Sequence, residues 1–127
     1  MFIQAVVPAF VNFRLFQYAS FSEPITLKDS GGVPLDVTNC TARMQIRREM
    51  TDTVPVFTLT TENGGITMGN TDGKMTLNIG FDDTDVAIDV DGELWYHDLL
   101  LKSADGDTVQ RTFQGTVAVY AGCTKPA

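Results

Sequence analysis

The chain has 127 residues, of which 43% are apolar and 20% charged, and its 16 acidic and 9 basic residues give a formal net charge of −7. This length fits one domain, and the apolar fraction is too high for a disordered chain. Nucleic acids and anionic membranes are bound mainly through Lys and Arg, so the acidic balance argues against both partners. We therefore expect one globular domain over residues 1–127 that binds neither nucleic acid nor a membrane.

The N-terminal segment is apolar but does not have the form of an export signal. It lacks a basic start, and Gln4 and Pro8 interrupt the apolar run. No stretch approaches the roughly 20 apolar residues that span a bilayer. An apolar start on a small acidic domain has to join a sheet or cover a neighbouring surface. We expect residues 1–9 to form a docking or oligomerisation arm, on a protein made in the cytoplasm.

In chain order, short runs of alternating apolar and polar residues predict β-strands. β-Branched residues are abundant, and pairs such as Asn63-Gly64 and Asp105-Gly106 mark turns between the runs. The predicted strands span residues 10–18, 24–28, 41–47, 54–60, 74–79, 93–102 and 109–120, with a short one at 66–68. Seven or eight such strands predict an all-β fold, an antiparallel immunoglobulin-like β-sandwich.

The alternation also predicts which side chains reach the core. In the strand at 41–47, Ala42, Met44 and Ile46 share one face. In the strand at 93–102, the odd-numbered residues from position 95 face the core and the even-numbered ones face solvent, with Leu100 an apolar exception. This strand should pair with 109–120 as a hairpin.

Acidic residues concentrate between positions 82 and 98, where no Lys or Arg occurs. A single helical turn is predicted at 82–87, because Asp82 or Asp83 can cap it. The loop between Asp82 and Asp91 also has the alternating carboxylates of a calcium loop, but its first ligand position falls on Ala87. We expect weak Ca²⁺ binding at most, the alternative being a solvated turn.

No motif for catalysis or for a cofactor occurs. His97 is the single histidine, and its alternating apolar neighbours predict a packed core residue rather than a base or ligand. Asp98 lies beside Trp95, but nothing places a second carboxylate opposite it, as glycoside hydrolysis requires. Cys40 and Cys123 form no metal-binding spacing, and we expect reduced thiols, with one disulfide as the alternative. We expect no catalytic residue, no cofactor, no resident metal and no enzymatic activity.

Two groups of residues are candidates for protein contacts. Arg43 and Arg47, with Arg48, form a basic stripe suited to an acidic partner. The alternative is ion pairing within the sheet, with carboxylates such as Asp98 or Glu49. The other group belongs to the apolar start of the chain. The candidate interface residues are Phe2, Ile3, Val6, Val7, Phe10, Arg43 and Arg47.

Residues 34–47 follow a pattern of the type P-x-D-L-T-G-x-x-A-x-M-x-I-R, with Asn39 and Cys40 in place of the turn that contains Gly. Further segments follow in order at residues 65–67, 73–77, 83–84, 95–101 and 109–119. Together they make residues 13–124 resemble small tail-associated β-sandwich proteins of bacteriophages, including the N-terminal domain of baseplate upper proteins.

This resemblance implies a non-enzymatic virion structural protein, an oligomeric adaptor at the tail, baseplate or fibre attachment. Its partners would be other virion proteins and copies of itself, and it would be made in the host cytoplasm. One alternative is a capsid decoration protein. A second alternative, from the aromatic residues, is a carbohydrate-binding module that stacks sugars on Trp95 and Tyr96.

Overall fold

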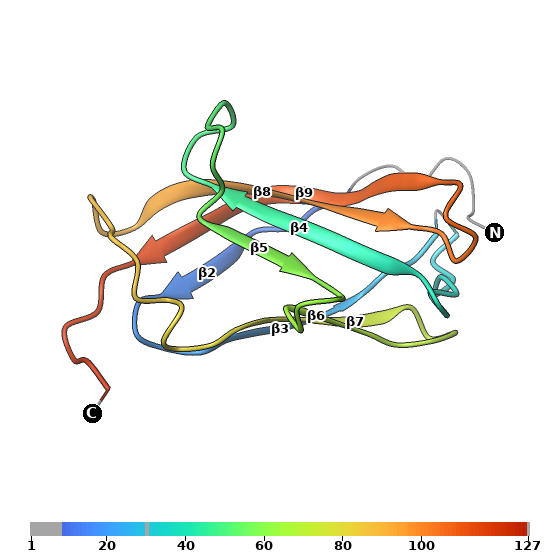
Figure 1. Cartoon of the computed structure of the whole chain (residues 1–127), viewed down its shortest axis with the longest axis horizontal. Helices are drawn as coiled ribbons and strands as arrows, with labels where there is room; N and C mark the ends of the chain where they lie inside the picture. The colour runs from blue at the N-terminus through green and yellow to red at the C-terminus, as the bar shows by residue number, and fades with distance from the viewer. Residues whose placement is uncertain (1–8, 30, 127) are drawn as a thin grey trace.

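Two packed β-sheets form the molecule, in a computed structural model that describes residues 9–29 and 31–126. Sheet A contains β1 (Ala9–Phe10), β2 (Phe13–Phe16), β4 (Thr41–Arg47), β5 (Phe57–Thr60), β8 (Glu93–Lys102) and β9 (Val109–Tyr120). Sheet B contains β3 (Phe21–Thr26), β6 (Ile66–Met68) and β7 (Lys74–Ile79). Figure 1 shows the two layers running along the long axis of the molecule.

The strand order identifies the type of sandwich. In sheet A the order is β1-β9-β8-β4-β5, and β2 continues β1 along the same edge of β9. In sheet B the order is β3-β7-β6. The chain passes from sheet A to sheet B after β2 and after β5, and it returns after β3 and after β7. The longest hairpin is formed by β8 and β9. This topology is that of an immunoglobulin-like β-sandwich, so the predicted fold class is confirmed.

Residue alternation explains the core. The inward residues Met44 and Ile46 of β4 are fully buried, as are Trp95, Leu99 and Leu101 of β8. Their outward neighbours on the same strands are exposed or half-buried. The predicted faces of these strands are therefore confirmed, and the predicted bounds of β4, β6, β7, β8 and β9 match the observed ones.

The first predicted strand differs most from the structure. It is broken at Val11 and Asn12 into β1 and β2, both of which pair with β9 in parallel rather than antiparallel. The break raises the number of strands to nine in the described part of the chain. The other differences are shifted ends: β3 begins at Phe21, whose side chain is buried, and β5 begins only after Pro55, which has no N–H to donate.

The helical turn predicted at 82–87 is wrong, because this segment is a series of non-helical turns. Thr84 is fully buried, and its hydroxyl donates to the carbonyl oxygens of Phe81, over 2.8 Å, or Ala19, over 3.0 Å. Thr84 thus anchors this segment to the turn between β2 and β3 instead of lying in a capped helix.

In the described part of the chain, no helix has the length and hydropathy needed to cross a membrane.

Candidate interaction face

The outer surface of sheet A gathers side chains from six strands. Cross-strand register places Arg43, Leu100 and Arg111 in one row across β4, β8 and β9. Residues that pair in register point to the same side of a sheet. We call this surface the sheet A face; it comprises Phe10, Arg14, Thr41, Arg43, Gln45, Arg47, Thr58, Thr60, Leu94, Tyr96, Asp98, Leu100, Lys102, Val109, Arg111, Gln114, Thr116 and Ala118.

Charge is distributed unevenly between this face and the rest of the molecule. Five of the nine basic residues of the chain belong to the sheet A face: Arg14, Arg43, Arg47, Lys102 and Arg111. Asp98 is the one acidic residue among the face residues, and Glu62 lies at the rim of a hollow there. An acidic protein therefore presents one cationic surface.

One ion pair crosses the face. Arg111 Nε lies 3.4 Å from Asp98 Oδ2, and the two side chains are 50% and 37% exposed. Pairs this exposed contribute less than about 1 kcal/mol to stability. Asp98 therefore pairs with β9, and the predicted pairing of Asp98 with Arg43 or Arg47 is not made within residues 9–29 and 31–126.

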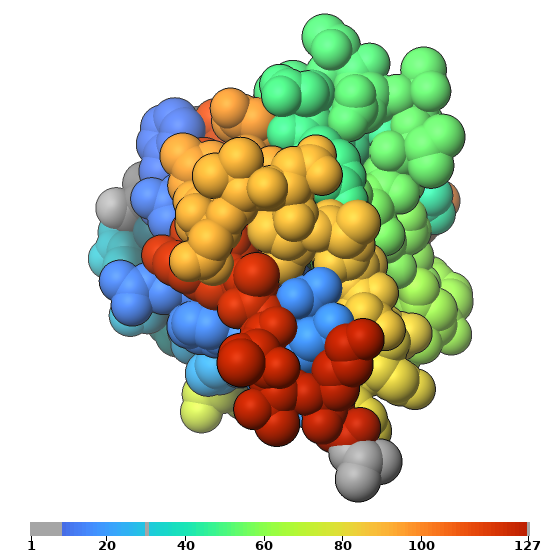
Figure 2. All heavy atoms as spheres, turned by 90° about the vertical axis from the view of Figure 1, so that its left-hand side faces the viewer, coloured from blue at the N-terminus to red at the C-terminus, as the bar shows by residue number. Residues whose placement is uncertain are grey.

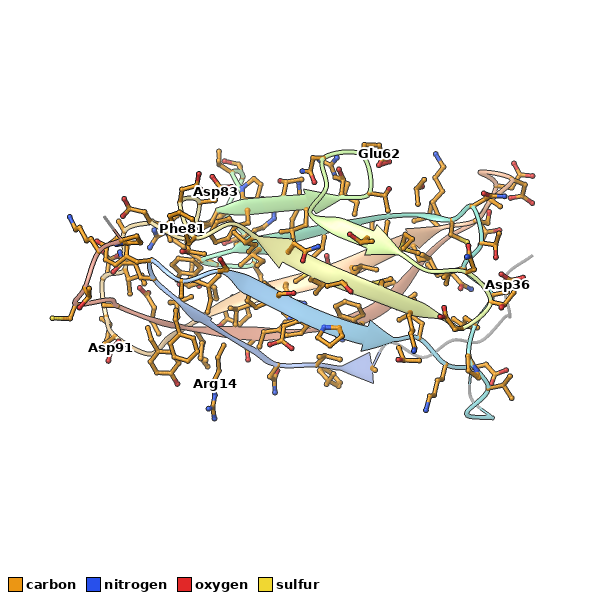
Figure 3. The ribbon with its side chains drawn as sticks, turned by 90° about the horizontal axis from the view of Figure 1, so that it is seen from below. Arg14, Asp36, Glu62, Phe81, Asp83 and Asp91 are labelled. Atoms are coloured by element: carbon orange, nitrogen blue, oxygen red, sulfur yellow. The ribbon has the colours of Figure 1, made fainter. Side chains whose placement is uncertain are left out.

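The remaining cations of the face differ in how they are held. Arg47 donates from Nη1 to the Asp52 carbonyl oxygen over 2.8 Å and from Nη2 to Gln45 Oε1 over 2.6 Å. Arg14 and Arg43 have no hydrogen-bond or ion-pair partner within the described residues, and the Arg14 side chain projects away from the ribbon (Figure 3). These guanidinium groups are available to an external carboxylate.

Exposed apolar side chains flank a hollow in the middle of the face. Phe10 of β1 is 79% exposed, and Met50, in the loop between β4 and β5, is 69% exposed. Between them lies a hollow of about 320 Å³ whose floor includes Tyr96, Asp98 and Gly115. Large apolar groups exposed around a cavity are typical of binding surfaces.

A second hollow, of about 410 Å³, lies further along the same face. Its lining includes Arg43, Lys102, Leu100 and Val109. Leu100, the apolar exception in the predicted alternation, is 39% exposed, and Val109 is 55% exposed. The sheet A face thus repeats one combination, cations beside apolar side chains, at two places.

The sequence-predicted interface residues are in part brought together. Phe10 comes from β1, Arg43 and Arg47 come from β4, and all three belong to the same face. Phe2, Ile3, Val6 and Val7 lie outside the described residues. Arg48, the third residue of the predicted stripe, is directed elsewhere: its guanidinium carbon lies 4.6 Å from the centre of the Trp95 ring.

Trp95 and Tyr96 do not form the exposed aromatic surface that was predicted to stack sugars. Trp95 is fully buried, with Arg48 stacked over its ring, so it offers no surface to a ligand. Tyr96 faces outward from the next position and is half-buried. The alternative prediction, a carbohydrate-binding module that stacks sugars on Trp95, is therefore wrong.

His97 is buried, as predicted, and burial lowers its pKa below the ordinary 6.5. Its Nε2 donates to the Val11 carbonyl oxygen over 2.7 Å. Sequence reasoning missed this contact, although Gly115 gave a signal. A glycine inside a strand marks a close approach of another backbone, and a Cβ at Gly115 would collide with the carbonyl of Val11.

Acidic residues of the connection between β7 and β8 lie at one end of the molecule. Figure 3 shows Asp83 and Asp91 at this end, with Asp36 at the other. Asp91 Oδ1 accepts from the Ala121 N–H over 2.8 Å, while the Asp89 N–H donates to Glu93 over 2.9 Å. In the described part of the chain, no three acidic, His or Cys side chains cluster as a metal site, which gives the predicted weak Ca²⁺ loop no support.

The two cysteines are both free thiols, so the alternative of a disulfide is wrong. Cys40 is buried and Cys123 is exposed. Burial raises the pKa of the Cys40 thiol, which keeps it protonated and unreactive.

The chain was compared with protein families, curated proteins and solved structures. No family model and no curated protein matches the chain. Among solved structures it is similar to a voltage-gated sodium channel beta subunit studied for multimeric cell-adhesive interactions, with a TM-score of 0.41, 9% identity, and coverage of 94% of this chain and 98% of the other. It is also similar to the extracellular domain of the voltage-gated sodium channel beta4 subunit, which forms parallel homodimers and acts in cell-cell adhesion, with a TM-score of 0.37, 10% identity, and coverage of 98% and 95%.

These comparisons overturn the expected resemblance to phage tail proteins. The two solved structures reported above are of voltage-gated sodium channel beta subunits, not of tail or baseplate components. The predictions of a virion structural protein, of a capsid decoration protein and of a virion location are therefore wrong. The segments behind the resemblance are strands and turns that an immunoglobulin-like sandwich needs in any case.

Proposed function

We propose that this chain is a non-enzymatic protein-interaction domain that binds its partner through the sheet A face. The observation that carries the proposal is the position of Phe10 and Met50, both strongly exposed, around a hollow on the cationic surface of an acidic protein. Aromatic residues, Met and Arg are enriched at the centres of protein interfaces.

The opposite surface of the sandwich supports the choice of face. The outward residues of sheet B are mostly small, uncharged and polar, such as Thr26, Thr76 and Asn78, with Lys74 as the one cation in register with them. Such a surface offers few anchors, because Thr and Ser are poor hot-spot residues. The sheet A face carries both the apolar anchors and the charge that selects a partner.

A protein partner fits the face better than a small molecule does. The two hollows are open parts of one sheet surface. Their linings include residues of β1, β4, β5, β8 and β9 and of the loop that contains Met50. Partners with carboxylates are favoured, because Arg43 and Arg14 are not neutralised within the described residues. Copies of the chain are candidate partners, and the role of residues 1–9 as a docking arm remains a prediction.

Binding of an acidic peptide tests the proposal. A fluorescent oligo-glutamate peptide should bind the wild-type chain at low salt, measured by fluorescence anisotropy. The variant Arg43→Glu/Arg111→Glu should bind at least tenfold more weakly, because the two substitutions reverse charge on the face.

The matched control is Lys28→Glu/Lys74→Glu, which changes the net charge equally at positions outside the face. This variant should bind the peptide within about twofold of wild type after correction for the common change in net charge. Equal losses in the two variants, or no binding by wild type, would contradict the use of the sheet A face.

A further inference from the structure

We infer that the partner of the sheet A face is a second copy of this chain, which presents the acidic connection between β7 and β8. The contact would be head-to-tail: the end of one molecule docks on the face of the next. The inference rests on the proposed function and names the partner that the face binds.

Carboxylates of the connection match the cations of the face. Asp82, Asp83, Asp85 and Asp89 are exposed, and their side chains have no hydrogen-bond or ion-pair partner within residues 9–29 and 31–126. No Lys or Arg occurs between Lys74 and Lys102. Arg48 reaches the connection, where it donates to the Ala87 carbonyl oxygen, but it forms no ion pair with these carboxylates within the described residues. Oppositely charged, unpartnered groups on two surfaces favour their association.

Apolar side chains accompany the charges on both surfaces. In the connection, Phe81 is 49% exposed and Val90 is 64% exposed. On the face, Phe10 and Met50 flank the central hollow. Figure 2 looks at the end of the molecule and shows the connection, yellow to orange, as an outer surface beside the C-terminal residues.

The turns at the opposite end are weaker candidates, although they are also acidic. Asp36 accepts hydrogen bonds from the N–H and hydroxyl of Thr38, and Asp105 accepts from the Ser103 hydroxyl and the Asp107 N–H. These bonds stabilise the ionised carboxylates within their own turns and lower their pKa values. Among the aspartates between β7 and β8, Asp91 accepts from the Ala121 N–H, whereas Asp82, Asp83, Asp85 and Asp89 have no such partner within residues 9–29 and 31–126.

A symmetric contact between two sheet A faces is disfavoured by charge. It would bring Arg43, Arg47 and Arg111 of one copy against the same residues of the other, and only Asp98 would offset them. Like charges brought together across an interface are destabilising. A face-to-end contact places opposite charges together instead.

A contact of the connection with the second hollow has to be intermolecular. The connection joins β8 at Glu93, whereas Lys102 and the second hollow lie at the far end of that strand. Nine residue steps at about 3.3 Å each separate the two by roughly 30 Å. When the end of one copy binds the face of the next, the two copies contribute different surfaces, so the interface is heterologous. Repeating such a contact gives an open row of subunits, or a ring if the rotation between neighbouring copies closes.

Sedimentation velocity on two charge-reversal variants tests the inference. Wild type should show a weight-average mass that rises with protein concentration at low salt and falls with added salt. The face variant Arg43→Glu/Arg111→Glu and the end variant Asp82→Lys/Asp85→Lys should each be monomeric alone. Their equimolar mixture should form a 1:1 dimer and nothing larger, since one component keeps its end and the other its face.

Each other outcome has a defined meaning. An end variant that still self-associates, or a mixture that stays monomeric while wild type associates, overturns the head-to-tail contact. Wild type that remains monomeric but binds oligo-glutamate also overturns it and leaves the proposed function intact, whereas loss of both contradicts both. Urea unfolding of each variant confirms that it is folded, and Lys28→Glu/Lys74→Glu should associate like wild type.

Discussion

His97 Nε2 donates a hydrogen bond to the Val11 carbonyl oxygen over 2.7 Å, which joins β8 to the segment between β1 and β2. The contact passes over Gly115, the register partner of His97 on β9, because that residue has no side chain to block it. A buried carbonyl group needs a donor, and His97 supplies it where the break between β1 and β2 leaves no strand partner.

His97 should make stability depend on pH. Burial lowers its pKa below 6.5, although the bond to Val11 and the charge of Asp98 act in the opposite direction. Between the folded and unfolded pKa values, the unfolded chain binds a proton that the native chain does not, so stability rises with pH in this window. The free energy of unfolding should therefore fall as the pH drops below 6.5.

The variant His97→Gln keeps an amide N–H for the Val11 carbonyl but does not titrate. Urea unfolding from pH 5 to 8 should show a smaller pH dependence in this variant than in wild type. Identical pH dependence in the two proteins would show that His97 does not contribute. Carboxylates affect both proteins equally at these pH values and cancel in the comparison.

Replacing Gly115 with Ala should displace the segment between β1 and β2. The added Cβ would collide with the Val11 carbonyl and would lie 2.8 Å from Asn12 Oδ1. Overpacking of this kind costs about 1–3 kcal/mol. Urea unfolding should show this loss, and hydrogen exchange should be faster in the residues of β1. Gly31→Ala, at an exposed position whose nearest group is the flexible Asp29 side chain, should change stability by less than about 0.5 kcal/mol.

Asn63 protects the free edge of β5. Its Nδ2 donates to the Thr58 carbonyl oxygen over 2.9 Å, and its Oδ1 accepts from the N–H groups of Thr60, over 2.9 Å, and Gly65, over 2.8 Å. An amide side chain thus occupies edge groups that another strand would pair with. Asn63→Ala should cost about 1–2 kcal/mol and increase aggregation, measured by light scattering during unfolding. Asn70→Ala, an exposed Asn whose side chain has no hydrogen bond within the described residues, should do neither.

Trp95 should tolerate replacement by Phe better than its size suggests. The residue is fully buried, and its indole Nε1 has no hydrogen-bond partner within the described residues. Phe removes an unsatisfied donor and leaves a small cavity, so the loss should stay below about 2 kcal/mol. Leu99→Ala, at a fully buried position without a polar group, should cost about 2–5 kcal/mol.

The fluorescence emission of Trp95 in the wild-type chain should be blue-shifted, because the ring is buried, and sugars should leave it unchanged. A sugar-dependent change in emission would contradict the conclusion that Trp95 binds no ligand.

The candidate face could be predicted in part. Strand alternation predicts that Arg43 and Arg47 point outward, and the apolar start of the chain makes Phe10 a candidate for a protein contact. Their meeting on one surface with Arg111 and Met50 depends on which strands are neighbours and on where the β4–β5 loop folds. These are contacts between residues far apart in the chain, which local periodicity does not encode.

The net charge of −7 and the strand pattern by themselves determined an acidic β-sandwich, with the bounds of five strands and the inward faces of β4 and β8. Period-2 alternation and glycine turns are local signals, so they survive without tertiary information. Only the tertiary structure decided that β1 and β2 pair in parallel with β9, and that five cations share one face while carboxylates gather at an end. Both results depend on strand pairing between distant segments, where burial of shared core residues outweighs local preference.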